Sequence, residues 1–148
     1  MATVPPVTKV LLSLHVIAAI VAVGPVTVAA SMFPAAVRAG RTDHLPLLHR
    51  ICRVYAAVGI AVPLFGLATA SALGVLGDAW LITSIALTGV AAAVLVFGVL
   101  PGQERLLAPR EGAVAIRTRL AMRTGVFNLL WATVTVLMIV RPGSTTGV

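Results

Sequence analysis

The chain has 148 residues, of which 59% are hydrophobic and 10% are charged, and its formal net charge is +7. Soluble domains are about 45–50% apolar and about 25% charged, so this composition excludes an ordinary soluble domain. A single cysteine excludes an intrachain disulfide framework. The length and the mean hydropathy of +1.08 together predict one transmembrane domain that occupies residues 1–148.

Four long apolar stretches follow one another along the chain, at about residues 10–36, 54–76, 80–100 and 120–140. A bilayer core about 30 Å thick requires about 20 apolar residues in helical conformation. Continuous apolar runs of this length are typical of membrane helices, whose backbone hydrogen bonds are all internal. The predicted fold class is therefore all-α, a polytopic four-helix membrane bundle.

The charges are distributed unevenly between the two sides of this bundle. The connections after the first and third stretches hold nine arginines and three acidic residues, a net charge of +6, whereas Lys9, Asp78 and Arg141 on the opposite side give +1. Short loops rich in arginine stay in the cytoplasm. Because ten arginines accompany one lysine, we expect a bacterial genome rich in G and C. The pattern predicts a multi-pass protein of a bacterial cytoplasmic membrane with both termini outside.

These basic loops also limit the partners of the protein. Arginines at the membrane surface are expected to contact the lipid bilayer at anionic headgroups. Nucleic-acid sites interleave aromatic side chains with basic ones, and only Tyr55 lies near these arginines. No nucleic-acid partner is therefore predicted.

Small residues recur on one face of the second stretch, at spacings that place them on a single helical stripe. The stripe consists of Gly59, Gly66, Ala70 and Gly74, with Pro63 between the first two. Small residues allow helices to approach closely in lipid. Because the connection at residues 77–79 is very short, we expect an antiparallel hairpin in which this stripe packs against the third stretch. Pro25 and Pro63 predict kinks, and Asn128 predicts a hydrogen bond between helices.

His15 is the only ionisable side chain in the uncharged core of any stretch, and such residues are candidates for function. Two interpretations are open. The imidazole is either a ligand of haem b or copper, or a neutral group that hydrogen-bonds to a neighbouring helix. Candidate partners at similar depth are Thr69, Ser71, Thr83 and Ser84. The second interpretation is favoured because no second ligand lies within the membrane, so no cofactor is expected.

His44, His49 and Cys52 lie together in the first basic loop, among leucines that predict an amphipathic turn on the membrane surface. Zinc requires four ligands, or three and a water molecule. The second basic loop offers only Glu104 or Glu111 to complete such a set. The sequence therefore predicts no metal site here.

Two segments resemble the CopD-like membrane superfamily: LLSLHVIAAIVAVGPVTVAASMFP at residues 11–34, and LMIVRPG at residues 137–143. The second is similar to the closing span of an uncharacterised family of predicted integral membrane proteins within it, with four transmembrane helices. Because the superfamily includes copper-resistance proteins and haem-binding HemJ-type protoporphyrinogen oxidases, the resemblance implies His15 as a haem or copper ligand. HemJ-type proteins also have a lysine in a later span, whereas the one lysine here is Lys9, so the resemblance does not extend to oxidase activity.

The leading functional hypothesis is a non-enzymatic integral membrane protein that associates with itself or with a larger membrane complex. A glycine-rich phosphate loop, a nucleophile–base pair and paired intramembrane carboxylates are all missing from the sequence, which argues against an ATPase, a hydrolase and a proton-coupled pump. The first alternative is a b-haem or copper redox protein that uses His15. The second is a small transporter, ranked last because the polar residues do not follow one face through the membrane.

Overall fold

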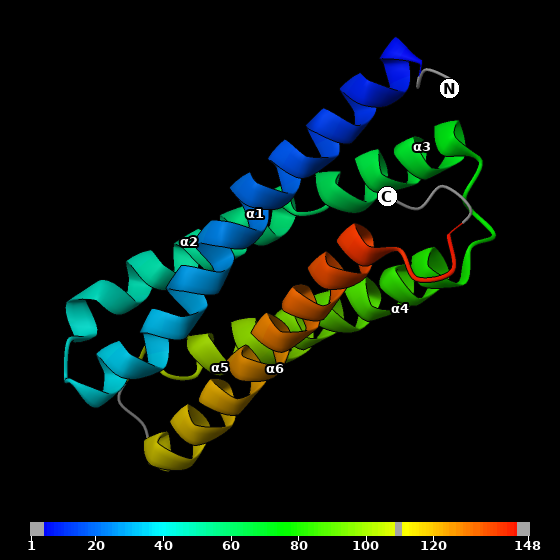
Figure 1. Cartoon of the computed structure of the whole chain (residues 1–148). Coiled ribbons are helices and arrows are strands. Elements are labelled where there is room, and N and C mark those ends of the chain that lie inside the picture. The colour runs from blue at the N-terminus through cyan, green and yellow to red at the C-terminus, as the bar shows by residue number, and fades with distance from the viewer. Residues whose placement is uncertain (1–4, 109–110, 145–148) are drawn as a thin grey trace.

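The computed structural model describes residues 5–108 and 111–144, which form helices joined by short turns (Figure 1). In chain order the elements are α1 (Pro6–Arg38), the 3₁₀ turn η1 (Thr42–His44), α2 (Leu45–Val58), α3 (Ala61–Leu73), α4 (Ala79–Ala93), the π-helical turn η2 (Val94–Val99), α5 (Leu100–Glu104) and α6 (Ala113–Val140). The predicted all-α four-helix arrangement is confirmed.

Four helical segments are long and apolar enough to cross a membrane: Pro6–Arg38, Thr42–Leu73, Ala79–Glu104 and Ala113–Val140. The shortest has 26 residues, which exceeds the roughly 20 that a bilayer core requires. Large apolar side chains on all four are exposed on the outside of the bundle, as lipid contact requires. The chain is therefore a multi-pass membrane protein.

The connections have the arrangement that the charge pattern requires. Helix α1 begins and α6 ends at one end of the bundle, and the α1–α2 and α5–α6 connections lie together at the other end (Figure 1). The two arginine-rich connections therefore share one side. We call this side the arginine-rich end.

The helices extend into the segments that the sequence analysis treats as loops. The second span starts nine residues earlier than expected, because α2 begins at Leu45 and packs against α1. Leu45 and Leu48 are buried on its inner face, while Arg50 and Arg53 are exposed on the other. The expected amphipathic surface turn is therefore part of the bundle, with its arginines extending outward from a packed helix.

The structure differs at the two prolines, Pro25 and Pro63, at which kinks are expected. Helix α1 continues without interruption through Pro25. The second span is broken at Gly59 and Ile60, where α2 ends and α3 starts. Pro63 explains this break, because its ring has no N–H for the Gly59 carbonyl and would clash with that carbonyl in a continuous helix. The Val62 N–H bonds to the Gly59 carbonyl instead, at 3.1 Å.

The helices pack as two groups. Helix α1 contacts α2 and α3, α6 contacts α4 and η2, and contacts between α1 and α6 join the groups. The main core lies towards the arginine-rich end and includes Phe33, Leu45, Val99, Leu120 and Phe127. Helix α3 packs mainly along α1. Within the small-residue stripe, Gly66 faces His15 of α1, whereas Ala70 packs with Trp80 and Leu81 of α4. The prediction that the stripe packs against the third span therefore holds at Ala70 and is wrong at Gly66. The short connection does reverse the chain direction (Figure 1).

Candidate functional site

Three polar side chains meet inside the arginine-rich end of the bundle. The Nδ1 atom of His49 lies 3.0 Å from Oε1 of Gln103, and Nε2 of Gln103 lies 3.4 Å from Sγ of Cys52. Gln103 and Cys52 have no exposed surface, and His49 is 7% exposed. We call these three residues the buried polar cluster. It connects the second span to the third.

The donor and acceptor roles in this cluster follow from the chemistry of the amide. An amide oxygen only accepts hydrogen bonds, so Nδ1 of His49 carries a proton and donates it to Gln103. The amide nitrogen of Gln103 donates to the sulfur of Cys52. The other ring nitrogen of His49 faces Oε1 of Glu104 at 3.5 Å, and the Glu104 side chain is 57% exposed. The cluster thus runs from a solvated carboxylate to a fully buried thiol.

Local sequence explains how these side chains come together. His49 and Cys52 are three residues apart, so they share one face of α2. Pro101 cannot donate to the carbonyl of Phe97 and would crowd it in an α-helix. The third span widens into the π-helical turn η2 just before Pro101, and such turns are frequent at functional sites. Gln103 follows in α5 and reaches α2.

Glycines allow α6 to approach this part of the third span closely. A Cβ at Gly102 would lie 3.2 Å from Cδ1 of Leu120, and one at Gly98 would lie 3.1 Å from Cδ of Arg123. The guanidinium of Arg123 donates to the Gly98 carbonyl at 3.2 Å. That carbonyl belongs to η2, so Arg123 helps to join α6 to the π-helical turn.

The structure brings His49, Cys52 and Glu104 into one neighbourhood, as their positions in the two basic loops suggest. In residues 5–108 and 111–144, no three histidine, cysteine or carboxylate side chains are arranged to hold a metal ion. Gln103 lies between His49 and Cys52 and bonds to both. The arrangement can join the second and third spans through these two hydrogen bonds.

His15 is held against α3 by two contacts. Its Nδ1 atom lies 2.9 Å from the carbonyl oxygen of Val62, and a Cβ added to Gly66 would lie 2.9 Å from its Cε1 atom. A carbonyl only accepts, so Nδ1 is the protonated nitrogen. Gly66 therefore has the close-packing role expected of it, with an imidazole as its neighbour.

The hydroxyl groups expected to bond to His15 have other partners. Thr69 donates to the carbonyl of Phe65, and Thr83 and Ser84 each donate to the carbonyl four residues earlier. Each of these hydroxyls donates its hydrogen bond to a backbone carbonyl of its own helix, which is common for Ser and Thr. The expectation for these three side chains is wrong, and the partner is a backbone carbonyl.

Of the other residues singled out for packing, Ala70 and Asn128 have the expected roles, and Gly59 and Gly74 do not. Ala70 is buried in a second cluster with Val75, Trp80 and Leu81. Gly59 lies at the break between α2 and α3. Gly74 ends α3 with φ of +69°, a conformation that favours glycine, and a Cβ there would meet nothing within 4 Å. Gly74 is thus a helix terminator and not a packing residue. Asn128 donates from Nδ2 to Oγ of Ser31 at 3.0 Å, which joins α6 to α1.

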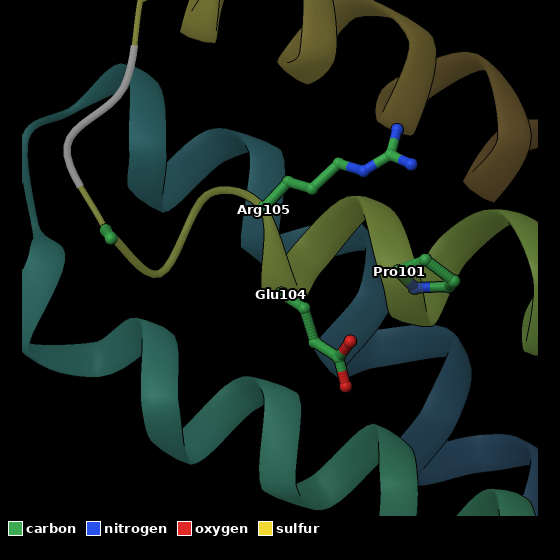
Figure 2. Close-up of a pocket in the computed structure, with 4 residues that line it drawn as sticks. Pro101, Glu104 and Arg105 are labelled. Atoms are coloured by element: carbon green, nitrogen blue, oxygen red, sulfur yellow. The ribbon is translucent and has the colours of Figure 1, made fainter.

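A surface pocket of about 380 Å³ lies beside α5, lined by Pro101, Glu104, Arg105 and Ala108. Figure 2 shows the Glu104 side chain directed towards α2 and the Arg105 side chain extending away on the opposite side. The two charges therefore do not converge on one ligand. Glu104 instead faces Nε2 of His49 at 3.5 Å.

Three features of the site were not expected from the sequence: Gln103, the contact of Arg123 and the carbonyl of Val62. Gln103 carries one usable signal, since it is an amide placed directly after Pro101 and Gly102 at the end of an apolar run. Its partners lie 54 and 51 residues earlier. The carbonyl of Val62 has no signal in the sequence, because every residue has one.

The chain matches no protein-family model, no curated protein and no solved structure.

Proposed function

We propose that this chain is a non-enzymatic integral membrane protein whose helices form a structural unit, which associates with a second copy or with a larger membrane complex. The supporting observation is that polar side chains inside the bundle form hydrogen bonds between spans. His15, Gln103 and Arg123 each bond to a neighbouring span. Hydrogen bonds of this kind hold membrane helices together where the hydrophobic effect does not act.

The size of the purified protein tests the assembly part of this proposal. After extraction in a mild detergent, light scattering coupled to size exclusion is expected to give a mass above that of one 15.2 kDa chain, either a multiple of it or a larger complex. A monomer in every mild detergent, together with no co-purifying protein, would contradict association.

We further propose that the arginine-rich end faces the cytoplasm of a bacterium and that both termini are outside. In the sequence, nine of the ten arginines fall between the first and second apolar stretches, or from the end of the third to the beginning of the fourth, and short arginine-rich connections are retained in the cytoplasm. A phosphatase fused after residue 148 is expected to be active. A fluorescent protein that matures only in the cytoplasm, inserted at Gly40, is expected to fluoresce. An inactive phosphatase on a fully expressed fusion would reverse the orientation.

A second candidate function is a redox protein that binds haem b or copper through His15. The observation in its favour is the tautomer. Histidine ligands usually donate their other ring N–H to a carbonyl or carboxylate, and Nδ1 of His15 bonds to the Val62 carbonyl at 2.9 Å. The Nε2 atom then has a free lone pair with which it could bind a metal. Only one ligand would come from this chain, and the same geometry also serves a purely structural role.

The absorbance spectrum and metal content of the purified protein separate the two candidates. For the structural role we expect no Soret band and no stoichiometric copper, and His15→Ala is expected to lower stability by about 0.6 kcal/mol, as for an average hydrogen bond between membrane helices. A stoichiometric chromophore in the wild type that His15→Ala abolishes, with helical content unchanged, would promote the redox function.

A further inference from the structure

An open groove of about 420 Å³ runs between α1 and α6 near the arginine-rich end. Its volume is in the range of about 300–1,000 Å³ that is typical of small-molecule sites. It is lined by Ser31, Pro34, Ala35, Arg38, Arg117, Thr118, Ala121, Thr124, Gly125 and Asn128. The lining thus combines two guanidinium groups with several polar side chains and contains no carboxylate.

Two polar groups in this groove lack hydrogen-bond partners in the described part of the chain. Oγ1 of Thr124 and Oδ1 of Asn128 are buried atoms without one, and Thr124 is 3% exposed. Eight other helical serines and threonines bond to the carbonyl four residues earlier. These are Ser13, Thr69, Thr83, Ser84, Thr88, Thr118, Thr133 and Thr135. A buried hydroxyl without a bond is unfavourable, so the hydroxyl of Thr124 is available to a ligand.

The charges at the mouth of the groove are also available. Arg38 is the last residue of α1 and Arg117 lies in the second turn of α6, and both line the groove. Within residues 5–108 and 111–144 neither has an ion pair. Guanidinium groups bind phosphate oxygens with two parallel hydrogen bonds, so the mouth suits a phosphate group.

The deep end of the groove continues into apolar surface. Val28 lies one turn before Ser31 and Leu129 lies one turn after Gly125, so both follow the faces that line the groove. They are 58% and 70% exposed. A ligand that fits this surface has an anionic head and an apolar continuation.

We propose that the groove is a binding site for an anionic phospholipid. The phosphodiester contacts Arg38 and Arg117, the hydroxyl of Thr124 donates to an oxygen of the lipid, and the acyl chains follow the apolar surface beside Val28 and Leu129. Asn128 and Ser31 already bond to each other, which fixes the floor of the groove. This inference goes beyond the proposed function and does not depend on association with other chains.

Native mass spectrometry of the full chain in detergent, with a mixture of phosphatidylglycerol and phosphatidylcholine, tests the site. Wild type is expected to retain phosphatidylglycerol preferentially. The variant Arg38→Gln/Arg117→Gln is expected to lose this preference by about tenfold or more, since it removes charge-assisted hydrogen bonds from the guanidinium groups to the phosphodiester. The matched control Arg41→Gln/Arg119→Gln makes the same charge change on exposed arginines outside the groove lining, and it is expected to keep the preference.

Thr124→Val keeps the side-chain volume and removes the hydroxyl, so it tests the site without changing charge. It is expected to weaken retention of phosphatidylglycerol by about fivefold, as for one hydrogen bond, with elution volume and helical content as in wild type. Equal losses in the control and groove variants would overturn the proposal, as would full retention by Thr124→Val. Displacement of the lipid by millimolar inorganic phosphate would show a soluble anion as the occupant and would also overturn it.

Discussion

Replacing Gly66 by leucine is expected to lower the stability of the bundle by about 1–3 kcal/mol, the usual cost of inserting atoms into packed space. A Cβ at this position would lie 2.9 Å from Cε1 and 3.1 Å from Nδ1 of His15. The imidazole cannot move away without losing its bond to the Val62 carbonyl. The leucine therefore either breaks this bond or separates α1 from α3. The thermal unfolding midpoint in detergent measures the effect.

Gly89→Leu is the matched control for this substitution. Gly89 lies inside α4, and a Cβ there would meet nothing within 4 Å. Both substitutions gain the same helix propensity of about 1 kcal/mol relative to glycine, so the difference between them isolates the contact with His15. A Gly66→Leu midpoint equal to that of Gly89→Leu would show that the imidazole moves aside at no cost.

A double variant identifies the neighbour responsible. His15→Ala removes the ring, so Gly66→Leu should be much less harmful in that background than in wild type. Residues in contact typically show coupling of about 0.5–3 kcal/mol in such cycles. Additive effects of the two substitutions would mean that the clash is with another part of α1.

The four spans were predictable, because long apolar runs reflect the thickness of the bilayer directly. The start of the second span was not. The charges of Arg50 and Arg53 suggest a loop outside the membrane. In the structure both lie on the exposed face of a helix, and Leu45 and Cys52 are buried on its opposite face. A group of arginines therefore does not mark the end of a helix.

The candidate site was predictable only in part. His15 and Gly66 stand out in the sequence, the first as an ionisable group and the second by its spacing. Their contact with each other depends on which helices are neighbours, and α3 packs mainly along α1. Gln103 was not predicted, because its role depends on the π-helical turn η2 before Pro101 and on partners in α2. Helix pairing in lipid relies on such specific contacts and leaves little trace in the apolar pattern.

Gln103→Leu is expected to destabilise the bundle more than most single polar deletions between membrane helices. Gln103 is fully buried, and its Oε1 atom accepts from His49 at 3.0 Å. Leucine would leave the Nδ1–H of His49 buried with no acceptor, which costs about 1–3 kcal/mol. The control Asn128→Leu removes a bond at a half-buried position and should cost about 0.6 kcal/mol, the average for such bonds in membranes. Unfolding midpoints in one detergent compare the two variants.

The double variant His49→Leu/Gln103→Leu is expected to recover most of the stability that Gln103→Leu loses. Removing both partners leaves neither a buried donor nor a buried acceptor, and replacing a pair by apolar groups of similar shape is often nearly neutral. Cys52 then loses a donor, but sulfur is a weak acceptor. Glu104 loses the neighbouring imidazole, but its side chain is 57% exposed and stays solvated. Recovery would show that the buried polar cluster determines which helices pair and adds little net stability. If the double variant is as unstable as Gln103→Leu or less stable, the cluster itself stabilises the arginine-rich end, and the polar bonds contribute more than apolar packing would at the same position.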